Sequence, residues 1–177
     1  MNAHMRVKHI CVQNLDELPN LRGSKYVQSE LGETYHQVQE QLKHNKMVLY
    51  VGSPCQIAGL RKTLQQDTHP CLITIDLLCS GVSSQDMFLN WLSTKYPLDS
   101  IAHLVFRDKK HGQGWRCDSM FIRTADGGEH SLSSSSDSFL KAFQDRLIFR
   151  EGCYHCQYST RTRVGDISLG DFWGVEE

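Results

Sequence analysis

The first half of the chain alternates between helical and extended patterns of hydrophobic residues. Apolar residues recur at helical spacing over 33–44, and a short β-rich apolar run follows at 47–51. A helix that begins after Ser53 leads to a second apolar run at 72–78. Since a strand–helix–strand of this length makes a right-handed crossover to a parallel neighbour, the pattern predicts a βαβ unit.

The second half of the chain shows a mixture of helix and strand patterns. Its predicted elements are a helix after Ser83 or Ser84, a third strand over 101–106, a hairpin of 120–123 with 129–132 around Asp126-Gly127-Gly128, and a helix after the serine-rich linker 131–138. Residues 150–164 show no regular pattern. The predicted fold class is α/β, with a parallel-sheet core, a βαβ crossover and an irregular cysteine-bearing loop.

Length and composition limit what kind of protein this is. The chain has 177 residues, of which 40% are hydrophobic, enough for one domain with a core of its own. Residues 1–23 show no periodicity, so we expect an N-terminal extension or linker before a domain over 24–177. The Gly- and aromatic-rich last residues look like the middle of a longer protein, so we expect truncation at the C-terminus.

Charge and hydropathy argue against two classes of partner. Nineteen basic and 20 acidic residues give a net charge of −1, so no overall field attracts nucleic acid. The longest apolar runs are too short to span a bilayer. The chain does not open with a secretory leader, so we expect a cytoplasmic protein.

Cysteine is the residue type that points to chemistry. The chain has seven cysteines. In a reducing compartment, clustered cysteines bind metal or react more often than they form disulfides. Cys153 and Cys156 form a Cys-x-x-Cys pair, which places two sulfurs close enough to bind one metal or two corners of a cluster.

Two further cysteines follow the predicted parallel strands. Cys55 lies just beyond the first strand and Cys79 just beyond the second, so both are expected at the carboxyl rim of the sheet, where open α/β sheets bind ligands. Ser53 as N-cap and Pro54 as first residue place Cys55 in the first turn of a helix, where the macrodipole favours a thiolate.

Spacing alone leaves other interpretations open. Four cysteines can hold zinc as well as an iron–sulfur cluster, although zinc sites usually consist of two close pairs. The thiols can also be unliganded, or Cys55 can be a nucleophile, but the sequence places no base beside it. Cys11, Cys71 and Cys117 have no partner in the pattern and are interpreted as packing residues.

Six motifs occur in the order of a known family. They are Ser24-Lys25-Tyr26-Val27-Gln28-Ser29, Gly52-Ser53-Pro54-Cys55-Gln56-Ile57-Ala58-Gly59-Leu60, Ile75-Asp76-Leu77-Leu78-Cys79-Ser80-Gly81-Val82, Phe106-Arg107-Asp108-Lys109 with Gly114-Trp115, the Cys153/Cys156 pair, and Gly170-Asp171-Phe172-Trp173-Gly174. Together they resemble the coenzyme F420 hydrogenase/dehydrogenase beta subunit family. Two positions depart from that family's pattern: Ser80 replaces a common His and Ser83 a common Pro.

The resemblance implies an iron–sulfur flavoprotein oxidoreductase that transfers electrons. It implies a 4Fe-4S cluster on Cys55, Cys79, Cys153 and Cys156, together with FAD. The hydroxyls and cation that could contact FAD are on Ser24, Lys25, Tyr26 and Ser29, and Gly52 and Ser53 offer an anion site at a helix start. The alternative for these six residues is a polar turn followed by an ordinary capped helix.

The resemblance also implies redox partners. We expect a redox partner protein or a ferredoxin-like domain, and a deazaflavin or another small redox substrate. The rival class is a binding module, held by zinc or free of metal, that serves in assembly and does not catalyse.

Overall fold

The computed structural model describes residues 5–109 and 119–171. The chain divides into two compact units, each built from two segments. The antiparallel-sheet unit contains Met1–Glu30 and Gly81–Tyr154, and the parallel-sheet unit contains Leu31–Ser80 and His155–Glu177. Each unit has its own hydrophobic cluster and is described separately.

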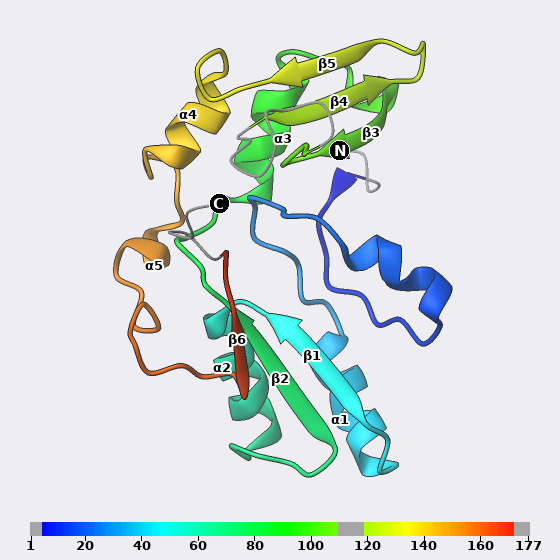
Figure 1. The fold of residues 1–177 in the computed structure, drawn as a ribbon, viewed down its shortest axis with the longest axis vertical. Coiled ribbons are helices and arrows are strands. Elements are labelled where there is room, and N and C mark those ends of the chain that lie inside the picture. The colour runs from blue at the N-terminus through cyan, green and yellow to red at the C-terminus, as the bar shows by residue number, and fades with distance from the viewer. Residues whose placement is uncertain (1–4, 110–118, 172–177) are drawn as a thin grey trace, which may run out of the picture. The chain divides into compact units, whose positions relative to one another are not determined.

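The parallel-sheet unit contains the predicted βαβ crossover (Figure 1). Its elements are α1 (Thr34–Lys43), β1 (Val48–Gly52), α2 (Pro54–Leu64), β2 (Leu72–Leu77) and β6 (Ile167–Leu169). The strand order is β1-β2-β6, with both pairs parallel. The sequence pattern did not predict β6, which is three residues long and exposed along its length.

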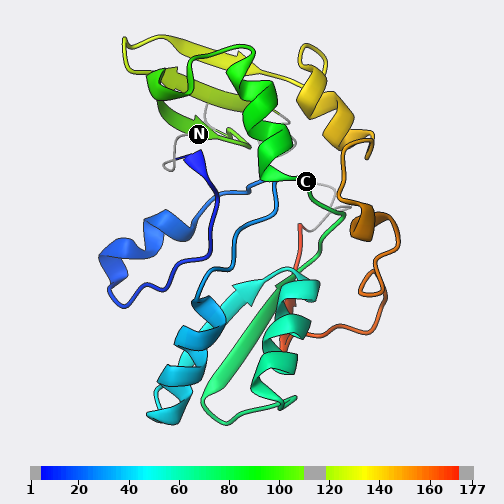
Figure 2. The same ribbon diagram turned by 180° about the vertical axis from the view of Figure 1, so that it is seen from behind.

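Helices α1 and α2 both cover one face of this sheet, as Figure 2 shows from behind. Their packing buries Val38 and Leu42 from α1, Ile57 and Leu60 from α2, and Tyr50 from β1. Helix α2 starts as predicted. The Gln56 side-chain oxygen accepts hydrogen bonds from the Ser53 N–H at 2.8 Å and from the Ser53 hydroxyl at 2.9 Å.

The antiparallel-sheet unit is built around a meander. Its elements are η2 (Leu15–Leu21), α3 (Gln85–Ser93), η3 (Leu98–Ser100), β3 (Ile101–Val105), β4 (Met120–Thr124), β5 (Glu129–Leu132), α4 (Ser138–Gln144) and α5 (Glu151–Tyr154). The strand expected over 101–106 is β3, which pairs antiparallel with β4 and does not extend the parallel sheet. The hairpin of β4 and β5 is confirmed, and its turn uses Gly127 at φ +89°.

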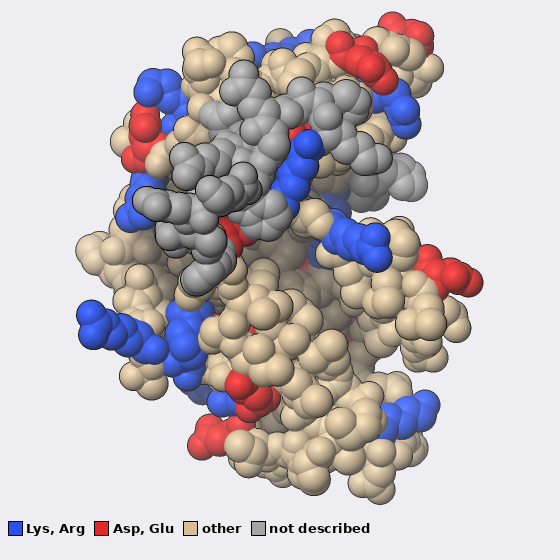
Figure 3. All heavy atoms as spheres, viewed as in Figure 1, with Lys and Arg blue, Asp and Glu red and all other residues tan. Residues whose placement is uncertain are grey.

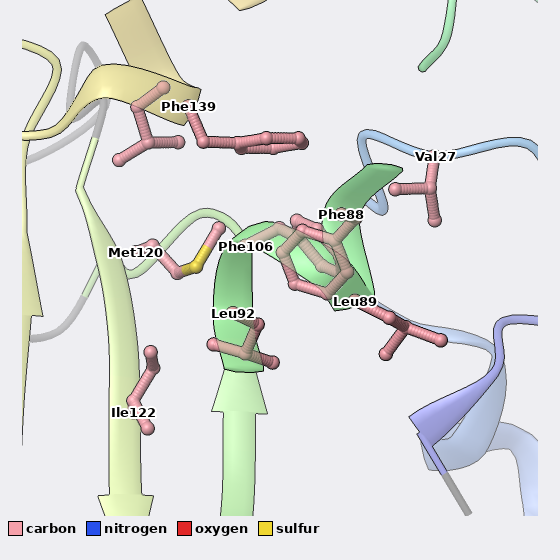
Figure 4. Close-up of a cluster of buried hydrophobic side chains, with 9 residues drawn as sticks. Val27, Phe88, Leu89, Leu92, Phe106, Met120, Ile122 and Phe139 are labelled. Atoms are coloured by element: carbon pink, nitrogen blue, oxygen red, sulfur yellow. The ribbon is translucent and has the colours of Figure 1, made fainter. Parts of the chain in front are cut away.

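Aromatic and branched side chains fill the core of this unit (Figure 4). Phe88 of α3 lies 4.8 Å from the Phe106 ring and 5.2 Å from the Phe139 ring, measured between centroids. Leu92, Met120 and Ile122 are completely buried beside them. Such a cluster holds α3 against the meander through apolar burial.

Two further expectations concern the loop and the membrane. The segment 150–164, predicted to be irregular throughout, begins with the short helix α5. Within the described ranges, none of the helices combines the length and the apolar character that a membrane crossing requires.

Candidate functional site

Two of the four predicted ligand cysteines lie at one edge of the parallel sheet. The register pairs Gly52 at the end of β1 with Asp76 near the end of β2. Cys55 and Cys79 each come three residues after these paired positions, and both are exposed. The carboxyl ends of neighbouring parallel strands meet at one rim, so the two thiols share that rim.

Cys55 sits in the first turn of α2, next to a hydroxyl. The Ser53 Oγ lies 3.2 Å from the Cys55 Sγ. The next residue is held from a second helix, because the Tyr35 hydroxyl of α1 donates to the Gln56 carbonyl at 2.7 Å. Among the described contacts of Cys55, the partner of the sulfur is thus an alcohol and not an imidazole.

Two phenols beside this turn also fail to supply a base. Burial raises the pKa of Tyr35, and burial together with the neighbouring Tyr35 raises the pKa of Tyr50 far above its usual value. Both phenols therefore stay protonated at neutral pH. The hypothesis that Cys55 is an activated nucleophile gains no support from its described surroundings.

The third strand of the sheet brings the glycine motif to the same rim. The Leu78 N–H donates to the Leu169 carbonyl at 2.8 Å, which continues the β2–β6 pairing past the end of β2. A Cβ on Gly170 would lie 2.3 Å from a side-chain carbon of Leu78, so a larger residue there would require the exposed Leu78 side chain to move. Gly170 and Asp171 therefore follow β6 beside the residue that precedes Cys79. Phe172, Trp173 and Gly174 lie outside the described residues.

The Cys-x-x-Cys pair stands where the two units divide. Cys153 lies in α5 and belongs to the antiparallel-sheet unit, whereas Cys156 belongs to the parallel-sheet unit. The Tyr154 hydroxyl fixes the short helix, since it donates to the Arg146 carbonyl at 2.7 Å and accepts from the Phe149 N–H at 3.1 Å. Both cysteines are partly exposed.

The four predicted ligands are of the residue type that binds iron–sulfur clusters. All four residues are thiols outside any disulfide, and each reaches solvent. Within the described ranges, no three His, Cys, Asp or Glu side chains converge on a position that could hold a metal ion. The convergence of the four sulfurs therefore remains a prediction.

The six residues predicted to contact FAD are divided between the units. Gly52 and Ser53 lie at the rim of the parallel sheet, whereas Ser24, Lys25, Tyr26 and Ser29 lie in the other unit. Three of the latter have partners of their own. The Tyr26 ring stacks on Phe143 with centroids 4.7 Å apart, the Lys25 ammonium donates to the Arg22 carbonyl at 2.7 Å, and the Ser29 hydroxyl lies 2.9 Å from the His9 Nδ1.

The sequence interpretation missed a polar latch between β2 and the turn before β6, which we define as Thr74 and Asp76 with Arg163, Asp166 and Ser168. Asp76 is fully buried, and its Oδ1 accepts hydrogen bonds from the Arg163 Nη2 at 2.8 Å and the Ser168 hydroxyl at 2.6 Å. The Asp166 carboxylate in turn accepts from the Thr74 N–H and the Thr74 hydroxyl, each at 2.7 Å. The latch fixes the start of β6 to the strand that carries Cys79.

The latch contacts change the acidity of both carboxyl groups. Burial alone would raise the pKa of Asp76, but hydrogen bonds from Ser168, Arg163 and the Gly165 N–H outweigh it and hold that pKa below its usual value. Hydrogen bonds from Thr74 lower the pKa of Asp166, assisted by the charge of Arg61. The signal in the sequence was the alternation of Thr74 and Asp76 within an apolar run.

The remaining cysteines stand apart from these groups. Cys11 is exposed near the N-terminus, and the Cys71 thiol lies 3.8 Å from the Asn45 carbonyl oxygen. Cys117 and the motif residues Gly114 and Trp115 lie outside the described residues.

Comparison with known proteins identifies one family. The profile of the C terminus of the coenzyme F420 hydrogenase/dehydrogenase beta subunit matches residues 45–177. No curated protein matches the chain. A solved structure, the xenon-derivatised F420-reducing NiFe hydrogenase complex from Methanosarcina barkeri, contains a chain similar to this one, with 18% identity and a TM-score of 0.49. The match covers 85% of this chain and 48% of that chain, so this chain spans about half the length of its structural match.

Proposed function

Because the chain belongs to the C-terminal family of coenzyme F420 hydrogenase/dehydrogenase beta subunits, we propose that it is an electron-transfer domain of an oxidoreductase. Cys55, Cys79, Cys153 and Cys156 would ligate a 4Fe-4S cluster, and FAD would bind beside it. The observation that supports the proposal is the β1–β2 register. Gly52 pairs with Asp76, and Cys55 and Cys79 each follow three residues later, at the same rim of the sheet.

The residues of the rim would have distinct tasks. The two rim thiolates would supply half of the ligands, and the Cys153/Cys156 pair the other half. The Ser53 hydroxyl lies 3.2 Å from the Cys55 Sγ, and its single proton would turn from the Gln56 side-chain oxygen to a ligating thiolate. Such a hydrogen bond would raise the reduction potential of a cluster. When bound, the cluster would supply one-electron transfer and the flavin would couple it to two-electron chemistry.

FAD binding is proposed on residues from both units. Gly52 and Ser53 precede an 11-residue helix, whose first N–H groups favour a phosphate. Ser24, Lys25, Tyr26 and Ser29 would contact the remainder of the cofactor. The proposed partners are a redox partner protein or a ferredoxin-like domain, with a deazaflavin or another small redox substrate, in the cytoplasm.

Purification without oxygen tests the cluster and the flavin together. The protein should be brown, should contain iron and sulfide in equal amounts, and should bleach on addition of dithionite. Cys79→Ser and Cys153→Ser should each abolish the iron content. Cys71→Ser is the matched control, because Cys71 lies in the same unit as Cys79 but away from the rim, and it should retain the cluster.

Three outcomes would contradict the proposal. A colourless protein containing zinc would favour the binding module, and equal iron loss in all three variants would show that the ligand set is wrong. Flavin is extracted from the same samples and quantified. Iron without flavin would remove the FAD part of the proposal and leave the cluster.

A further inference from the structure

Among the residues that the structure describes, helices cover one face of the parallel sheet, the face on which α1 and α2 pack. Tyr50, Thr74 and Asp76 point to the face beneath α1 and α2 and are buried. The alternate positions point to the opposite face, and six of them are large apolar residues that are 41–61% exposed: Leu49, Val51, Ile73, Leu77, Ile167 and Leu169. We call this set the open apolar face.

Strand register joins these residues into continuous rows. Leu49 pairs with Ile73 across β1 and β2, and Leu77 pairs with Leu169 across β2 and β6. Ile75 pairs with Val51 on one side and with Ile167 on the other, so it completes a middle row. In Figure 3 this face is an uncharged surface over β1 and β2, with charged side chains at its margins.

A face of this kind needs a covering layer. Parallel strands with apolar residues on both sides are typical of sheets that are buried on both faces. Soluble monomers rarely expose a contiguous apolar patch of more than a few hundred Å² unless it binds something. The six residues, each about half exposed, present on the order of 500 Å² of apolar surface.

We propose that the open apolar face is a dimer interface, on which a second copy of this chain packs its own open apolar face about a two-fold axis. Such an interface must be self-complementary, and a face without charge places no like charges opposite each other. Two identical sheets also have the same twist, which lets them pack face to face about 10 Å apart with interdigitated side chains. Two such faces would remove about 1,000 Å² from water, the area at which specific interfaces begin.

Sedimentation of the purified chain, in reductant so that exposed thiols cannot crosslink, tests the proposal. The mass should rise from the 20.3 kDa of one chain to twice that value as concentration increases from about 1 to about 200 µM. Ile73→Asp places one carboxylate from each copy within the apolar interface and should weaken association by about 100-fold. Leu49→Lys on the edge strand should have the same effect.

The control is Met87→Asp, since Met87 is 45% exposed in α3 of the other unit. It should leave association unchanged. A monomer at every concentration would overturn the proposal, as would a dimer that survives both Ile73→Asp and Leu49→Lys. Growth beyond two copies would contradict a closed two-fold interface. If Ile73→Asp lowers the melting temperature strongly, Leu49→Lys decides, because Leu49 is 61% exposed and lies on an edge strand.

Discussion

Asp76 is an acidic residue within an apolar strand, and its carboxylate is fully buried. The Arg163 guanidinium and the Val164 and Gly165 N–H groups all donate to it. In Asp76→Asn, the amide keeps one acceptor but turns an NH₂ group towards donors and leaves the Arg163 charge without its counter-ion. We expect the free energy of unfolding to fall by about 2–4 kcal/mol, measured by urea denaturation.

The control for this prediction is an exposed ion pair. Asp145 lies 3.1 Å from the Lys141 ammonium, and both side chains are about half exposed or more. Asp145→Asn should leave the stability unchanged, because water solvates both charges when the pair is broken. Equal losses in Asp76→Asn and Asp145→Asn would show that burial does not decide the cost.

Gly59 lies inside helix α2, and the nearby Tyr35 side chain leaves no room for a larger residue at this position. A Cβ at this position would lie 2.8 Å from the Tyr35 hydroxyl oxygen, which donates to the Gln56 carbonyl. Alanine is the better helix former by about 1 kcal/mol, but here it would displace the phenol and break that hydrogen bond. We expect Gly59→Ala to lower the melting temperature. Gly152→Ala, with open space around the new methyl group, should leave it unchanged or raise it.

Helix α4 depends on one buried carboxylate at its start. The Asp137 Oδ1 accepts from the Phe139 N–H at 2.9 Å and the Leu140 N–H at 3.1 Å, and its Oδ2 lies 2.9 Å from the Lys95 ammonium. Asp137→Ala removes the cap and should cost about 2 kcal/mol in urea denaturation. Ser135→Ala in the same serine run should cost little, because the contact of Ser135 with Ser133 is exposed. A larger loss in Ser135→Ala would contradict this role of Asp137.

Elements that carry a local signal were predictable from the sequence. The crossover from β1 through α2 to β2 has apolar strands, a capped helix start and a suitable length, and the structure confirms it. The hairpin of β4 and β5 was recognised through its glycine turn. These signals are local because backbone preference and neighbouring side chains determine them.

Elements that depend on distant contacts were not predictable. Strand β6 has three exposed residues and no pattern of its own, and it is held to β2 by the Arg163 and Asp166 contacts. The antiparallel pairing of β3 was also hidden, because a single strand does not reveal its partner. Of the candidate site, the rim position of Cys55 and Cys79 followed from the crossover, whereas the placement of Cys153 and Cys156 depends on the fold of both units.

At the scale of the whole molecule, the two units differ in what stabilises them. The antiparallel-sheet unit has a cluster of aromatic rings around Phe88, Phe106 and Phe139. The parallel-sheet unit has a smaller apolar cluster and adds the polar latch with its two carboxylates. Acid should therefore weaken the parallel-sheet unit, because it protonates the carboxylates of Asp76 and Asp166.

The pKa values of Asp76 and Asp166 are both lower in the folded chain than in the unfolded chain. Their stabilisation is then complete above the unfolded value of about pH 4 and is lost as the pH falls towards the folded values, because the unfolded state binds protons first. We expect the free energy of unfolding to be flat from about pH 6 to 5 and to fall below about pH 4. In urea titrations at each pH, Asp166→Asn should flatten this fall and Asp145→Asn should not. Parallel curves for the wild-type chain and Asp166→Asn would assign the acid sensitivity to other carboxylates.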